Sequence, residues 1–268
     1  MTQSTPVVNG GIKYIYGLQM SYTSTTTITV QAGRARDQFN VNDIVVGYAP
    51  NVAASQTGEA TVPPYPAPVA TVVSTAFNGA GGLDTGTIAA STFYAVWAIG
   101  DSFNNNPGSI ILSLSSVVPQ YPMGYNTSRR IGYILTDSMS HILNFWQYGN
   151  GDSRDMYYDV GIAAPTTAGS TSYAPIALGA SVPPITAEVI MKVAYTANSA
   201  TNIASFIPYG SSASAGITVF GYGVAAEQQG MLKILTQLNT TPAPAFQYKT
   251  TSASDTLVLT VAGYTDNL

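Results

Sequence analysis

The sequence contains no cysteine and very little charge. Its 268 residues include 9 Lys and Arg, 13 Asp and Glu and one His, so charged residues make up 8% of the chain, against about 25% in ordinary soluble domains. The absence of cysteine excludes disulfide scaffolds, thiol nucleophiles and thiolate metal sites. A disordered chain is excluded as well, because such chains combine low hydrophobicity with high net charge, whereas this one is 46% hydrophobic at a net charge of −4.

Long apolar runs and basic patches are also missing. The longest nearly continuous apolar segment, residues 93–99, is far shorter than the ~18 residues of a membrane-spanning helix, so we expect no membrane insertion. The nine Lys and Arg residues are scattered and the sequence pI is about 4.7, so we expect no nucleic-acid partner. The first residues lack the basic and apolar regions of a secretory signal, and we expect no export signal.

Alternation of apolar and polar residues is the dominant pattern that is present. In residues 185–195 every odd position is apolar, and both charges, Glu188 and Lys192, are at even positions. This pattern is typical of a strand with one buried and one exposed face. Residues 230–238 fit helix and strand periods about equally, and we interpret them as a strand because their neighbours on both sides are predicted strands.

The sequence therefore predicts an all-β protein with two domains. Residues 1–165 are expected to form an N-terminal antiparallel β domain, and residues 166–268 a C-terminal, jelly-roll-like β-sandwich. The boundary is placed in residues 161–172, whose small uncharged residues are typical of a connector. Residues 130–136 and 139–148 flank Asp137 and Ser138 and predict a hairpin. The proline-rich residues 49–69 predict an excursion outside the sheets.

Serine hydrolase chemistry depends on a single residue, because a base must accept the proton of the nucleophile. The one histidine, His141, alternates with apolar neighbours along a predicted strand. We interpret it as a structural residue. No Gly-x-Ser-x-Gly motif accompanies it, and we expect no catalytic residue, no cofactor and no metal.

Carboxylates and aromatic residues gather around residues 146–159, which makes sugar chemistry the main enzymatic alternative. Asp152 and Asp155 are close in sequence to Trp146 and Tyr157, and paired carboxylates cleave glycosidic bonds. These four residues are candidate glycan contacts, and a carboxylate-based polysaccharide depolymerase is the less favoured version. The plainer interpretation is a solvated turn in which Arg154 offsets the two acids.

Basic and acidic residues elsewhere are expected to form ion pairs, within a domain or between subunits. Arg129 and Arg130 are the only adjacent basic residues, and arginine favours bidentate pairs with carboxylates. The candidate partners are Asp84 and Asp137, with Asp37 and Asp43 as further acids for these arginines and for Arg34 and Arg36.

The 18 tyrosines are spread along the whole chain and are not grouped with Lys and Arg. Interface cores lose charged residues and gain aromatic ones. The composition therefore indicates that part of the surface is covered by neighbouring subunits, and structural assembly is the function it favours.

Several segments resemble a family of bacteriophage virion proteins found as fibre-like or decoration components. The matching segments cover about residues 16–150, and Gly82-Leu83-Asp84-Thr85-Gly86 and Arg129-Arg130-Ile131-Gly132 are the most specific. The others are residues 16–21, 26–37, 42–44, 93–97, 119–125 and 145–149. Beyond residue 170 the likeness is weaker, with an ending at residues 255–266 similar to the last strand of fibre jelly-roll modules.

The resemblance implies a β-rich, commonly trimeric virion component and carries no catalytic residue. Together with the composition, it predicts a non-enzymatic structural protein that binds copies of itself and other virion proteins of the capsid or the tail. Its expected location is the virion, after synthesis in the host cytoplasm and release by lysis. A tail fibre that binds host-surface glycans is the alternative. Whether the protein sits on the head or the tail is left open.

Overall fold

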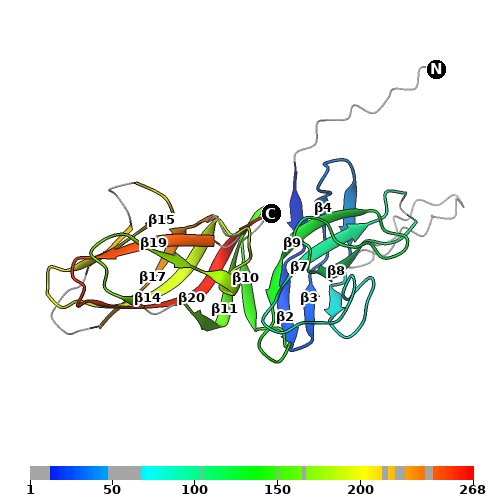
Figure 1. Cartoon of the computed structure of the whole chain (residues 1–268). Helices are drawn as coiled ribbons and strands as arrows, with labels where there is room; N and C mark the ends of the chain where they lie inside the picture. Colours follow the sequence, from blue (N-terminus) through cyan, green and yellow to red (C-terminus); the bar gives the residue numbers. More distant parts are fainter. Residues whose placement is uncertain are drawn as a thin grey trace, which may run out of the picture. The chain divides into compact units, whose positions relative to one another are not determined.

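The computed structural model describes residues 13–47, 68–103, 105–149, 151–164, 167–212, 217–220, 227–238 and 244–268. Within these ranges the chain forms antiparallel strands, one short 3-10 helix, η1 (Gly179–Ser181), and no α-helix. The expected all-β fold is confirmed (Figure 1). Contacts divide the chain into a first unit, Met1–Ala90, Tyr94–Ile142 and Asn150–Asp152, and a second unit, Ser91–Phe93, Leu143–Gly149 and Ser153–Leu268. None of the described segments is a helix long and apolar enough to cross a membrane.

The first unit is built from three small sheets of three strands each, with the orders β1-β4-β5, β2-β3-β6 and β8-β7-β9. Its strands are β1 (Ile15–Gly17), β2 (Met20–Ser24), β3 (Thr27–Val30), β4 (Gly33–Arg36), β5 (Asp43–Val46), β6 (Thr71–Ser74), β7 (Phe93–Gly100), β8 (Ser109–Ser113) and β9 (Thr127–Leu135).

The core of the first unit lies around β7 and β9. In β7 every residue after Phe93 is buried, and in β9 all nine residues are buried. A continuous apolar run such as that of β7 is typical of a strand covered on both faces. The burial of β9 includes two charged residues, Arg129 and Arg130, which an apolar pattern does not predict.

The second unit contains two larger sheets, and the chain passes repeatedly from one to the other. The six-stranded sheet has the order β10-β11-β20-β14-β17, with β12 paired to β20, and the five-stranded sheet the order β13-β19-β15-β16, with β18 paired to β19. The strands of the first sheet are β10 (Phe145–Tyr148), β11 (Ser153–Ala163), β12 (Thr167–Ala168), β14 (Glu188–Thr196), β17 (Glu227–Leu235) and β20 (Thr256–Asn267). Those of the second are β13 (Ala174–Ala177), β15 (Ile203–Pro208), β16 (Ile217–Phe220), β18 (Gln237–Leu238) and β19 (Pro244–Thr250).

Burial in the second unit follows the alternation of the sequence, which gives it a sandwich-like character. In β14 the odd residues Val189, Met191, Val193 and Tyr195 are buried, and Lys192 is exposed. Ile190 is also buried, next to the register shift between β14 and β20. The segment with ambiguous periodicity is strand β17, paired antiparallel to β14, as expected. Figure 1 shows β15 and β19 of the one sheet lying along β14, β17 and β20 of the other.

Half of the described residues of the expected connector, 161–172, belong to the six-stranded sheet. Strand β11 continues to Ala163, and β12 pairs with β20. The small residues serve close packing: a Cβ on Gly161 would lie 2.4 Å from Thr260 Cγ2. The contact-based division falls at residues 142 to 153, so the expected boundary at residue 165 lies inside the second unit.

The predicted hairpin around Asp137 is wrong in its extent. Only the bridge Thr136↔Ile142 joins the two segments, and β10 pairs with β11 of the second unit instead. Asp137 Oδ1 accepts the N–H groups of Met139 and His141 at 2.8 Å each, which closes a tight loop and ends the pairing. The proline-rich segment lies outside the described residues, except for Pro68 and Val69.

Candidate functional site

An open hollow with aromatic walls lies on the six-stranded sheet of the second unit. It encloses about 610 Å³, within the range of small-molecule sites. We call it the aromatic hollow, and it is lined by Trp146, Tyr148, Tyr157, Tyr158, Asp159, Gly161, Lys192, Met231, Thr260 and Ala262.

The aromatic side chains meet because β10 and β11 pair in a register that places them on one face. Trp146 is the cross-strand neighbour of Tyr157, and such neighbours on a sheet have side chains in contact distance. The rings of Tyr148 and Tyr157 are 5.7 Å apart and nearly perpendicular, at 79°. Trp146 is 46% exposed and Tyr148 57% exposed, so the hollow presents aromatic surface to solvent.

The buried side of the same strands anchors the hollow. Tyr158 is buried, its ring is 6.2 Å from that of Tyr264, and its hydroxyl donates to the carbonyl of Ser181 at 3.3 Å. Burial raises the pKa of Tyr158 well above its ordinary value, so this hydroxyl stays protonated and acts as a donor at neutral pH.

Polar groups stand at the rim of the hollow. The carboxylate of Asp159 accepts a hydrogen bond from the Asn144 amide through Oδ2, at 3.1 Å. Lys192, on β14, is exposed and is the cross-strand neighbour of both Met231 and Thr260. The lining therefore offers one carboxylate, one ammonium and the hydroxyls of Thr260 and the tyrosines beside apolar surface.

Asp155 shares this face of the sheet but does not line the hollow. Lys233 Nζ lies 2.8 Å from each of its carboxylate oxygens, and the Thr265 hydroxyl donates to Oδ1 at 2.7 Å. The hydrogen bond with Asp155 is the main reason that the pKa of Lys233 is raised. Asp155 is therefore held in an ion pair.

Asp152, the second candidate acid, belongs to the first unit. Its Oδ1 lies 3.7 Å from Nη2 of the buried Arg129. Burial lowers the pKa of Arg129, and the charge of Asp152 opposes that shift. Of the four candidate glycan contacts, the structure brings Trp146 and Tyr157 together in the hollow, pairs Asp155 with Lys233, and pairs Asp152 with Arg129.

The other candidate ion-pair residues have different neighbours. The Arg130 guanidinium lies over the ring of Tyr133, 4.8 Å from its centroid. Asp84 accepts the N–H of Gln120 at 3.0 Å. Asp137 holds its own loop through N–H donors, and its Oδ2 lies 3.6 Å from Nδ1 of His141. These two acids therefore organise loops.

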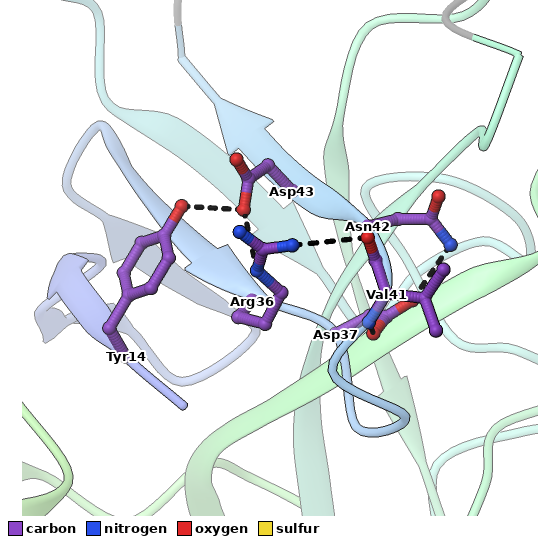
Figure 2. Close-up of polar contacts among 6 residues, drawn as sticks. All are labelled: Tyr14, Arg36, Asp37, Val41, Asn42 and Asp43. Atoms are coloured by element: carbon purple, nitrogen blue, oxygen red, sulfur yellow. Dashed lines mark hydrogen bonds and ion pairs between the residues drawn. The ribbon is translucent and has the colours of Figure 1, made fainter. Parts of the chain in front are cut away.

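A polar cluster in the first unit joins β4, β5 and the turn between them (Figure 2). The hydroxyl of Tyr14 donates to Asp43 Oδ1 at 2.7 Å, and Arg36 Nε lies 3.0 Å from the same oxygen. Arg36 also donates to the carbonyl of Val41, and Asp37 accepts the Val41 N–H and the Asn42 amide. Asp37, Val41 and Asn42 hold the turn, while Asp43 also binds Tyr14, which precedes β1, so the groups drawn in Figure 2 tie neighbouring segments of the unit together.

The residues that the sequence did not single out, Lys192 and Met231, come from strands far along the chain. The alternation of β14 places Lys192 on the exposed face, but only the register of β14 with β17 and β20 places it beside Met231 and Thr260. No sequence signal short of that register links them to Trp146.

Neither a search for metal ligands among the described residues nor comparison with known proteins identifies the function of the hollow. Among the described residues, no group of three or more His, Asp or Glu side chains is placed to hold a metal ion. No protein-family model matches the chain, and no curated protein sequence matches it significantly. Chemically, the hollow is suited to holding a flat ligand that has one apolar face and polar edges.

Proposed function

We propose that the chain is a non-enzymatic structural protein of a bacteriophage virion, assembled as a homotrimer and docked on the capsid or the tail. The main observation in favour of assembly into a trimer is a group of exposed apolar side chains on adjoining loops of the first unit. The segments resembling virion proteins support the bacteriophage part of the proposal. We also propose that the strands of the second unit are connected as in a jelly roll.

The apolar loop end consists of the turn 37–42 and the loops formed by residues 101–103, 105–108 and 121–126. The N–H of Gln38 donates to the carbonyl of Ser128, next to the third loop. The N–H of Ser102 donates to Asn126 Oδ1 at 2.8 Å, and the Asn106 amide donates to the carbonyl of Gly124 at 3.0 Å. These four segments are thus held close together.

Large apolar side chains project from these segments. Phe39 is 72% exposed, Phe103 77% and Met123 100%. Apolar groups gathered in this way mark interaction surfaces in soluble proteins, and the low charge of the chain keeps repulsion between copies small. The proposal assigns this end to contact with neighbouring copies of the chain.

The two candidate acids favour this proposal over a depolymerase. Glycoside cleavage needs two carboxyl groups that flank one bond, one as acid and the other as base or nucleophile. Asp152 and Asp155 are each paired with a basic residue, Arg129 and Lys233, and they belong to different units.

The test is the mass of the purified full chain in solution, by light scattering coupled to size exclusion. We expect a species of three times 28.0 kDa at micromolar concentration, and dissociation in the variant Phe103→Ser/Met123→Ser. The control Val72→Ser changes an exposed apolar residue of β6 and should remain trimeric. A wild-type monomer that is also absent from purified virions of the encoding phage would reject the proposal.

A further inference from the structure

The aromatic hollow of the second unit combines features that the assembly proposal does not use. Its lining includes the exposed aromatic side chains Trp146 and Tyr148, while the apolar loop end belongs to the first unit. We propose that the hollow binds a carbohydrate chain, with one sugar ring stacked on Trp146 and flanked by Tyr148 and Tyr157.

A sugar ring fits this surface chemically. It has an apolar C–H face and hydroxyl groups around its edge, so it needs a flat apolar wall and a mixture of donors and acceptors at the rim. Lys192 supplies a donor, Asp159 an acceptor and Thr260 both. One positive and one negative group give the rim no net charge, which favours a neutral glycan over a phosphate backbone.

The backbone shapes the hollow. The register of β11 with β20 shifts between Tyr157 and Ile162, and such bulges re-aim side chains next to binding sites. Gly161 lies in this shift, where a Cβ would meet Thr260 Cγ2. Tyr157, Asp159 and Thr260 all line the hollow beside this shift, and the missing Cβ at Gly161 leaves room for the Thr260 methyl group.

The rim carboxylate is also held in position. Asn144 binds Asp159 twice, because its carbonyl accepts the Asp159 N–H at 3.0 Å and its amide donates to Oδ2 at 3.1 Å. These bonds orient the carboxylate before a ligand arrives, which lowers the entropy cost of binding. A hydroxyl of the sugar would donate to Oδ1.

The two tryptophans make the proposal measurable. Trp146 lines the hollow, whereas Trp97 is buried in β7 of the first unit. The full chain is applied to an array of bacterial surface polysaccharides and neutral oligosaccharides, and a sugar that binds is then titrated by intrinsic fluorescence. We expect binding on the array and a change in Trp146 emission that saturates with the sugar.

The variants separate the hollow from the rest of the surface. We expect Tyr157→Ala to weaken binding at least about tenfold, and Lys192→Ala to weaken it by a smaller factor without removing any packed side chain. The matched control is Tyr16→Ala, an exposed tyrosine of β1 in the first unit, which should leave the affinity unchanged.

Three outcomes would overturn the proposal: a silent array, a sugar whose affinity is unaffected by both Tyr157→Ala and Lys192→Ala, and a change of solution mass in Lys192→Ala. The last outcome would assign this face to contact between copies. The assembly test uses Phe103 and Met123, so failure of glycan binding leaves the trimer proposal standing. Conversely, a monomeric protein that binds sugar would reject the trimer and leave the glycan site standing.

Discussion

Three carboxylates of the first unit differ from Asp255 of the second unit in how far along the chain their hydrogen-bond partners lie. In the first unit, Asp37, Asp101 and Asp137 accept N–H groups from residues two to five positions further along the chain. In the second unit, Asp255 accepts hydrogen bonds from the Tyr195 hydroxyl and the Asn202 amide, 60 and 53 residues away. These three carboxylates of the first unit close local loops, and Asp255 of the second unit ties together segments distant in the chain.

The difference has an energetic consequence. Asp37 accepts hydrogen bonds from only two groups of its own loop, so removing it leaves two donors without that acceptor. Asp255 is 2% exposed and also accepts the N–H groups of Asn198 and Ser252. Removing it leaves several buried donors without an acceptor, and each such donor is costly.

The largest expected effect is therefore that of Asp255→Ala. We expect it to lower the free energy of unfolding of the second unit by about 3 kcal/mol. The measurement is urea unfolding followed by tryptophan fluorescence, with Trp97→Phe so that Trp146 reports the second unit alone.

Asp37→Ala is the matched variant in the first unit, since Asp37 is equally buried and accepts two hydrogen bonds. We expect a loss of about 2 kcal/mol there, reported by Trp97 in a Trp146→Phe background. If Asp37→Ala costs as much as Asp255→Ala or more, the contrast between local and long-range carboxylates does not hold.

Lowering the pH tests the same comparison between Asp255 and the carboxylates of the first unit. Burial would raise the pKa of Asp255, but the hydrogen bonds from Asn198, Asn202, Tyr195 and Ser252 outweigh it and hold the pKa below its ordinary value. A group with a lowered folded pKa stabilises the protein above its unfolded pKa, near 3.9, and loses this contribution as pH falls through the folded pKa. We expect the second unit to lose stability below about pH 4.

The control for this pH dependence is Asp255→Asn, which has no titrating group at the position. The variant should be less stable at neutral pH and should fall less steeply in acid, as measured by unfolding curves at a series of pH values. The first unit should keep its own acid dependence in both proteins, because N–H donors also lower the pKa of Asp101 and Asp137. An unchanged slope for the second unit would refute the role of Asp255.

A smaller effect is expected where β11 meets β20. Gly161→Ala places a methyl group 2.4 Å from Thr260 Cγ2, so the Thr260 side chain must shift, and we expect a loss of about 1 kcal/mol. Thr260→Ser removes the opposing methyl group and should restore most of the stability in the double variant. Gly230→Ala is the control in the same sheet, since nothing lies within 4 Å of a Cβ there. Equal losses at both glycines would show that close packing is not the cause.

The same contrast explains how far the sequence predicts the structure. The all-β class, the buried face of β14 and the strand at β17 follow from the local alternation of apolar and polar residues, because successive side chains of a strand point to opposite faces of its sheet. Residues 161–163 and 167–168 of the expected connector lie in strands, which the sequence does not reveal because small residues occur both in flexible connectors and where strands approach closely. Only the neighbour, here Thr260, distinguishes the two cases.

The residues of the candidate site also fall into those that local sequence predicts and those that only sheet pairing brings together. Trp146 and Tyr157 are eleven positions apart and meet in adjacent strands, so a local aromatic cluster predicts them. Lys192 and Met231 reach the hollow through pairing across the sheet, and Asp155 is taken up by Lys233, 78 residues away. Sequence proximity grouped Asp155 with the aromatic residues, whereas sheet register determined its partner.

The smallest expected effect tests whether long-range pairing is stabilising in itself. Lys233 and Asp155 form an ion pair whose side chains are 45% and 26% exposed, and Arg36 and Asp43 form one in the first unit at 25% and 49%. Solvent screens pairs this exposed, so double-mutant cycles with Lys233→Met/Asp155→Asn and Arg36→Met/Asp43→Asn should each give a coupling energy of about 0.2 to 1 kcal/mol.

Each coupling should also weaken at high salt, and that of Lys233 should disappear as pH rises through its raised pKa, because the pair needs the protonated amine. Equal couplings would mean that distance along the chain matters only where the carboxylate is buried, as at Asp255. A coupling of several kcal/mol for Lys233 and Asp155 would instead make the exposed face of the six-stranded sheet a main source of the stability of the second unit.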